Sequence, residues 1–123
     1  MKLTRDARSD VNLIRGYGSG AVQIGERVVS THCIVAADTL ITSFDAASAA
    51  ELGSAHLERI FALEPELVLL GTGATQSFPS AAVRQAFAQR GIGLEAMDLG
   101  AACRTYNVLV QEERRVAAAL FLR

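Results

Sequence analysis

The sequence has few of the residues that form disulfide bonds in small proteins or bind metal ions. It contains two cysteines, Cys33 and Cys103, and two histidines, His32 and His56. Two cysteines are too few for a disulfide framework, and each lies in an apolar run, so we expect buried free thiols in a reducing compartment. The four side chains are too scattered along the chain to form a metal site. The sequence therefore predicts no metal site and no cofactor.

Long apolar runs and concentrated positive charge are also missing. No run approaches the 18 residues of a membrane-spanning helix, and residues 1–10 lack the apolar segment of a secretory signal. Twelve basic and thirteen acidic residues give a net charge of −1 and are interspersed. This pattern provides neither a nucleic-acid-binding stripe nor a polybasic membrane anchor. We therefore expect a cytoplasmic protein with no nucleic-acid partner and no membrane insertion.

What is present is typical of a globular protein. Half of the 123 residues are hydrophobic and 20% are charged, which differs from a disordered composition. A chain of this length buries about 65–70% of the surface that its unfolded form exposes. No repeat, low-complexity segment or linker interrupts it, so we predict a single domain over residues 1–123.

The first 44 residues have the pattern of β-strands. After a loose lead-in over residues 1–10, we expect strands at residues 12–15, 21–24, 27–30, 32–36 and 39–44. Gly25 opens the two-residue loop of the hairpin between the second and third strands, as a type II′ turn requires. Glycine-rich residues 16–20 should end the first strand, with Tyr17 covering the core. These elements predict one antiparallel β layer.

The next segment is ambiguous. Asp45 could cap a short alanine-rich helix over residues 45–53, but the small residues there also suit a surface loop. From Ser54 onward, apolar residues recur with helical spacing and predict a helix that ends before Pro65. His56 lies off the apolar face of this helix, so we expect it to be solvated.

The remaining chain alternates strands with helices. We expect strands at residues 66–70, 93–97 and 115–122 and helices at residues 79–90 and 98–112, with Asp98 as a cap and Gly91 as a stop. The continuous apolar run at 66–70 is typical of a parallel strand that is buried on both faces. Two right-handed crossovers would join these strands. The sequence thus predicts an α/β fold, an antiparallel N-terminal β layer followed by a β-α-β-α-β parallel unit.

One candidate site follows the first parallel strand. Gly71, Thr72 and Gly73 should lie at its carboxyl end and Asp98 at the carboxyl end of the next strand, where α/β sheets commonly bind ligands. Gln76 takes the third glycine position of a dinucleotide fingerprint, and no lysine follows for a P-loop. The glycines therefore predict a tight turn between strand and helix, a nucleotide site, or a binding site for a small anion.

The helix after Asp98 has a second candidate surface. Arg104 and Asn107 lie on a polar face, with Thr105 between that face and the apolar one. They could bind a carboxylate, phosphate or carbonyl group together. Alternatively, Arg104 could pair with Asp98 or Glu112 while Asn107 holds a neighbouring loop. We expect Cys103, on the apolar face, to be an inert core thiol.

Several motifs resemble one known family. They are residues 102–109 (ACRTYNVL) and 113–120 (ERRVAAAL), together with Gly16–Gly18, Leu69–Gly73, Pro79 and Glu95–Asp98. They resemble the Mth-type domain family, a domain of unknown function with relatives in mitochondrial complex I assembly factor three and the adipogenesis-associated Mth-domain protein. The resemblance implies a three-layer β and β/α fold and a lineage that assists complex I assembly. It supplies no catalytic residue.

Two functions remain open at this stage. The first is a non-catalytic binding or assembly protein with a protein partner, because no convincing catalytic set is present. The alternative is a small-anion or metabolite binder, or an enzyme, with ligand-binding residues Gly71, Thr72, Gly73, Asp98, Arg104, Thr105 and Asn107. If the last strand lay at a sheet edge, a homodimer would also be plausible.

Overall fold

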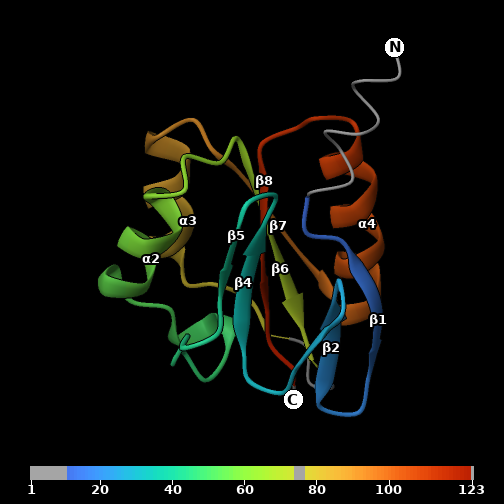
Figure 1. Ribbon diagram of the computed structural model, residues 1–123. Coiled ribbons are helices and arrows are strands. Elements are labelled where there is room, and N and C mark those ends of the chain that lie inside the picture. The colour runs from blue at the N-terminus through green and yellow to red at the C-terminus, as the bar shows by residue number, and fades with distance from the viewer. Residues whose placement is uncertain (1–10, 74–76, 123) are drawn as a thin grey trace.

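Two β-sheets organise the chain, as Figure 1 shows for the computed structural model, which describes residues 11–73 and 77–122. An antiparallel sheet contains β1 (Ile14–Gly18), β2 (Ala21–Ile24) and β3 (Arg27–Val29), in that order. A mixed sheet contains β4 (Cys33–Ala36), β5 (Thr39–Ile41), β6 (Leu67–Thr72), β7 (Gly93–Asp98) and β8 (Val116–Leu120), in the order β5-β4-β8-β6-β7. Strand β6 is parallel to both β7 and β8, whereas β4 is antiparallel to its neighbours. The predicted α/β class is confirmed.

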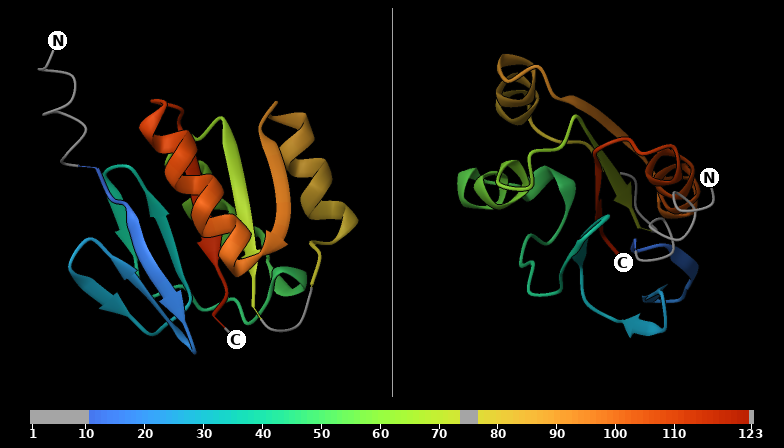
Figure 2. Two further views of the ribbon diagram at one scale, coloured as in Figure 1. Left: turned by 90° about the vertical axis from the view of Figure 1, so that its right-hand side faces the viewer. Right: turned by 45° about the horizontal axis from the view of Figure 1, so that its top comes forward.

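The helices complete a three-layer arrangement. They are the 3₁₀ turn η1 (Ala49–Glu51), α2 (Ser54–Phe61), α3 (Ala81–Gln89) and α4 (Leu99–Gln111). Helix α3 connects β6 to β7, and α4 connects β7 to β8. Helices α2 and α3 cover one face of the mixed sheet, while α4 and the three-stranded sheet cover the other (Figures 1 and 2).

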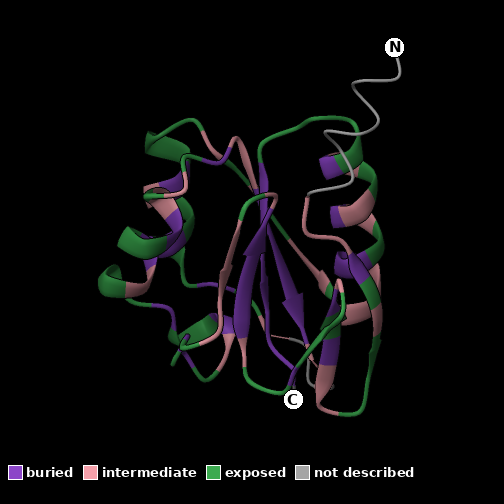
Figure 3. Ribbon diagram, in the orientation of Figure 1, coloured by how far each residue is buried: buried purple, intermediate pink, exposed green. Residues whose placement is uncertain are grey.

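Alternating side chains of the mixed sheet build a core on each face. Along β8, Ala118 and Leu120 face α4 and the three-stranded sheet, whereas Ala117 and Ala119 face α2 and α3. All five residues of β8 are buried, and the centre of the sheet is accordingly buried in Figure 3. A strand that is buried on both faces requires an unbroken apolar sequence, which explains the pattern of residues 116–122.

Local sequence signals set the ends of the helices. The Asp98 side chain accepts a hydrogen bond from the Ala101 N–H (2.8 Å) at the start of α4, as predicted. Gly91 follows α3 with φ of +69°, which is the left-handed conformation expected of a helix stop. Glu113 occupies the equivalent position after α4 with φ of +65°, where a residue with a Cβ is strained.

The structure corrects several predicted elements. Strands β4 and β5 belong to the mixed sheet, because β4 pairs with β8, so the first 44 residues do not form one layer. Strand β1 continues through the glycine-rich stretch to Gly18. Residues 45–53 contain only the 3₁₀ turn η1, and Asp45 caps no helix. Helix α3 begins at Ala81 after a Ser80 cap, two residues later than expected. The predictions for residues 1–10 and 74–76 lie outside the described residues.

The last strand lies in the middle of its sheet. Strand β8 pairs with β4 on one side and β6 on the other, so it is not an edge strand. The condition under which we expected a homodimer is therefore absent. Among the described residues, no helix combines the length and apolarity needed to cross a bilayer.

Candidate functional site

The polar face of α4 contacts β1. The Asn107 side chain accepts a hydrogen bond from the Ile14 N–H (2.9 Å) and donates one to the Ile14 carbonyl oxygen (2.8 Å). A neighbouring strand would satisfy the same two backbone groups in the same way. Asn107 therefore covers part of the free edge of the three-stranded sheet with an amide from the helix.

Tyr106 extends this attachment toward the mixed sheet. Its buried hydroxyl donates to the carbonyl oxygen of Asn12 (2.8 Å). The Asn12 amide in turn donates to the carbonyl oxygens of Ala36 (2.9 Å) and Thr39 (3.2 Å) at the β4–β5 turn. A chain of hydrogen bonds thus connects α4 to β4 and β5 through Asn12, which lies two residues before β1.

Arg104 makes the third contact to β1. One of its terminal nitrogens donates to the Tyr17 hydroxyl (2.8 Å), so its partner is not Asp98 or Glu112. Tyr17 lies against Gly100, where an added Cβ would approach the tyrosine oxygen to 2.7 Å. Tyr17 is 47% exposed and covers the start of α4. The structure adds this Tyr17–Arg104 contact to the sequence-predicted site.

The predicted strand-end residues do come together. Thr72 and Asp98 are register partners in the parallel pairing of β6 with β7. Thr72 is 2% exposed, and its hydroxyl donates to the Met97 carbonyl oxygen (3.3 Å). Gly71 serves close packing, because an added Cβ would lie 2.9 Å from the Cβ of Ala102 on α4. Gly73 follows Thr72 and is half-buried.

Six of the seven predicted site residues divide into two groups. Gly71, Thr72, Gly73 and Asp98 share the carboxyl ends of β6 and β7, whereas Arg104 and Asn107 contact β1. Asn107 lies eight residues beyond the first residue of α4, which is about 12 Å along the helix axis. Thr105, the seventh predicted residue, is half-buried on α4.

Both thiols are core groups, as predicted. Cys33 and Cys103 are free and buried. Burial raises the pKa of Cys33 to about 12, helped by the nearby Cys103 charge, and burial raises the pKa of Cys103 to about 11. Both are therefore protonated and poor nucleophiles at neutral pH. Within the described part of the chain, no group of three or more His, Cys, Asp and Glu side chains could hold a metal ion.

The predicted solvation of His56 is wrong. Its Nδ1 accepts a hydrogen bond from the Gly53 N–H (2.9 Å), so the proton resides on Nε2, which donates to Asp45 Oδ1 (2.7 Å). The hydrogen bond from His56 holds the pKa of Asp45 below its usual value. The ring also packs edge-on against Phe44. These contacts tie the segment before η1 to the start of α2, which is a structural role.

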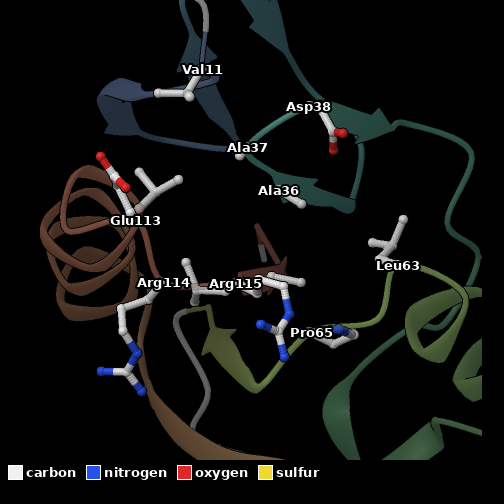
Figure 4. Close-up of a pocket in the computed structure, with 12 residues that line it drawn as sticks. Val11, Ala36, Ala37, Asp38, Leu63, Pro65, Glu113, Arg114 and Arg115 are labelled. Atoms are coloured by element: carbon white, nitrogen blue, oxygen red, sulfur yellow. The ribbon is translucent and has the colours of Figure 1, made fainter. Parts of the chain in front are cut away.

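Sequence analysis also missed two cavities in the part of the chain that the structure describes. One lies at the amino ends of β6 and β8, has a volume of about 390 Å³ and is lined by residues including Val11, Asp38, Leu63, Pro65 and Arg115 (Figure 4). In the sequence its charged lining residues resemble an ordinary solvated turn, so nothing there identified a cavity. It is at the opposite end of the parallel strands from Thr72 and Asp98.

The second cavity lies between α3 and β7. It has a volume of about 360 Å³, and its lining includes Phe78, Phe87, Leu94 and Ala96. Phe78 is 55% exposed beside it. An aromatic residue directly before Pro79 was a visible signal in the sequence, but only the structure places it next to a sheet edge.

Comparison with known proteins supplies the family. Residues 14–121 match the family described as "Protein of unknown function (DUF498/DUF598)". The chain belongs to this family. The solved structure of a Xanthomonas campestris protein is 40% identical with a TM-score of 0.82, covering 90% of this chain and 84% of that one. A Bordetella pertussis structure described as a Mth938-like domain is 26% identical with a TM-score of 0.77, covering 91% and 86%.

Two curated relatives of this DUF498/DUF598 chain have informative names. The zebrafish (Danio rerio) NADH dehydrogenase [ubiquinone] 1 alpha subcomplex assembly factor 3 is 32% identical over 88% of this chain and 63% of its own length. A "13 kDa major membrane protein" of Francisella tularensis is 38% identical over 53% of this chain and 53% of its own length. The chain thus spans between about half and two thirds of the length of these relatives. The predicted resemblance to the assembly-factor lineage is confirmed.

Proposed function

We propose that this protein is a non-catalytic binding protein that supports the assembly of a larger protein complex. The observation that carries the proposal is the use of the α4 polar face. Asn107 and Tyr106 bind the backbone of residues 12–14, and Arg104 binds Tyr17. Arg104 and Asn107, which the sequence offered for ligand binding, are thus engaged in joining α4 to the three-stranded sheet.

The chemistry of the remaining side chains supports the same proposal. The two thiols are buried with raised pKa values, and the Asp45–His56 pair has a structural role at the start of α2. The relatives named as assembly factor 3 point in the same direction by analogy. Fold and family alone do not carry an activity, so the link to a respiratory complex is part of the proposal.

Affinity capture at native expression level tests the proposal. The tagged full-length chain should be recovered with a stoichiometric partner and should elute from gel filtration well above 13.1 kDa. An untagged culture is the control for background. Cell fractionation before capture tests the cytoplasmic location, which we propose for the free chain. Recovery of the chain alone, from both the soluble fraction and detergent-solubilised membranes, would overturn the proposal.

The strand-end residues support a second candidate, a binder of small anions or metabolites, or an enzyme acting on them. Thr72 and Asp98 lie side by side at the carboxyl ends of β6 and β7, beside the start of α4. A panel of nucleotides and carboxylates tests this candidate by thermal shift, since a ligand at a hundredfold excess over its Kd adds about 2.7 kcal/mol. Arg104→Ala should remove the shift if this residue belongs to the site. No shift with the wild-type chain would reject the candidate.

A further inference from the structure

Strand β7 has an open edge. It is the terminal strand of the mixed sheet, and within residues 11–73 and 77–122 it pairs only with β6. The Gly93 N–H donates to the Glu66 carbonyl oxygen beside β6 (3.0 Å). This hydrogen bond shows which residues of β7 direct their backbone groups toward β6 and which direct them outward. Residues 93, 95 and 97 direct their backbone groups toward β6, so Leu94 and Ala96 direct theirs outward. The outer edge therefore presents unpaired donors and acceptors.

The two faces of this edge differ in chemistry. Leu94 and Ala96 pack with Phe87 on the α3 side, where they line the 360 Å³ cavity beside the exposed Phe78. Met97 packs on the α4 side, and Glu95 shares that face because side chains alternate along a strand. The cavity is lined mainly by apolar residues, together with Arg84 and Glu95. The edge therefore offers a largely apolar cavity and an exposed carboxylate, Glu95.

We infer that β7 binds an extended segment of a partner protein, which adds a sixth strand to the mixed sheet. The segment would have apolar residues at alternate positions, entering the cavity beside Phe78, and a lysine or arginine between them, facing Glu95. This inference rests on the proposed binding function and identifies its surface. Strand addition of this kind takes its affinity from backbone hydrogen bonds and its specificity from alternate side chains.

Charge selects the occupant. Strand β7 contains two acidic residues, Glu95 and Asp98, and no basic residue. A second copy that paired through its own β7 would bring four acidic residues to one ladder, and like charges across strands are unfavourable. A basic segment instead gains an opposite charge at Glu95. Apart from Arg84 and Glu95, the residues that line the cavity are apolar, so the residue that enters the cavity should be apolar.

A synthetic peptide provides the direct test. The probe is a blocked seven-residue peptide in which valine and arginine alternate between terminal threonines, and its control has glutamate in place of arginine. Titrated into the ¹⁵N-labelled full chain, the arginine peptide should give saturable NMR shifts at the amides of Leu94 and Ala96. The glutamate peptide should bind roughly threefold or more weakly, because a cross-strand ion pair is replaced by a repulsion.

Three variants separate strand addition from general adhesion. Ala96→Pro removes an outward N–H that β6 does not use, a position where a sheet edge accepts proline, and should abolish binding. Glu95→Arg should reverse the preference between the two peptides. Phe78→Ala, at an exposed side chain, should weaken peptide binding without affecting the fold. If Ala96→Pro does not fold, Phe78→Ala and Glu95→Arg together test whether the peptide binds at β7. Val28→Ala, at a residue 66% exposed on β3, is the matched control and should leave the affinity unchanged.

The outcomes are decisive in each direction. Absence of binding at millimolar peptide, shifts located away from β7, or unchanged affinity in Ala96→Pro and Glu95→Arg would overturn the inference. So would a wild-type dimer that becomes monomeric in Ala96→Pro, since the occupant would then be a second copy. If affinity capture recovers a stoichiometric partner that these variants retain, the proposed function stands and the β7 surface is wrong. If the peptide binds β7 but no native partner is recovered, the proposed function fails instead.

Discussion

The attachment of α4 to β1 can be broken at one side chain. Asn107→Ala removes both hydrogen bonds to Ile14 and leaves a backbone N–H and a carbonyl without partners in a partly buried position. Each orphaned backbone group costs about 1–3 kcal/mol when it is fully buried. Because this position is only partly buried, the pair should cost roughly 2–4 kcal/mol, the lower part of the summed range. Alanine recovers about 0.6 kcal/mol through its higher helix propensity. We therefore expect the free energy of unfolding to fall by roughly 1.5–3.5 kcal/mol.

Urea unfolding followed by circular dichroism measures this loss, because the chain has no tryptophan for fluorescence. Amide hydrogen exchange at Ile14 provides the local readout and should accelerate in Asn107→Ala more than exchange in β6. Asn107→Asp keeps the shape and the acceptor but loses the donor, so it should also destabilise. Gln111→Ala, at an exposed position on the same helix, is the matched control and should change stability by less than about 0.5 kcal/mol.

A small effect would refute the structural role. If Asn107→Ala costs less than about 0.5 kcal/mol, the level of an ordinary surface substitution, the two hydrogen bonds do not hold β1 in place. Unchanged exchange at Ile14 would lead to the same conclusion. The Asn107 amide would then be available to an external ligand, and the alternative site on α4 would gain support.

Three further positions test other parts of the fold. Gly71→Ala should lower the free energy of unfolding by roughly 1–3 kcal/mol, since the new Cβ meets Ala102; adding Ala102→Gly should recover part of the loss in a double-mutant cycle. Glu113→Gly should stabilise by roughly 0.5–1 kcal/mol in urea unfolding by relieving a left-handed residue, whereas Gly91→Ala should destabilise by about 1 kcal/mol. The histidine partner of Asp45 lowers its pKa, so the stability it contributes is present above the ordinary value of 3.8 and is lost as the pH falls below it. Asp45→Asn should therefore flatten the acid limb of a stability–pH profile, and an unchanged acid limb would contradict this account.

Local features were predictable because their physical causes lie within a few residues. The Asp98 cap acts on the N–H of Ala101, and the Gly91 stop depends on its own backbone conformation. The hairpin of β2 and β3 likewise depends on Gly25, whose φ is +61°. Signals of this kind can be read from a short window of sequence.

Long-range pairing was not predictable from such windows. The register partner of Cys33 in β4 is Leu120 in β8, and strand pattern alone cannot say which sheet a strand joins. Asn107 likewise finds its partner 93 residues away. A polar residue on a helix looks the same in sequence whether it binds a ligand or a strand edge. The neighbouring positions of Thr72 and Asp98 at the strand ends were therefore predictable, whereas the contacts of Arg104 and Asn107 with β1 were not.

Two sheet edges, at β1 and at β7, are protected by different side chains, and the difference has a physical basis. At the edge of β1, the Asn107 amide supplies the donor and acceptor that a neighbouring strand would supply. At the edge of β7, Glu95 and Asp98 are exposed acidic residues, and the Glu95 backbone groups point toward β6. Charged residues commonly protect open edges from pairing with identical strands. Acidic residues that discourage self-pairing also favour a basic segment across the ladder, which is the occupant that we infer for β7.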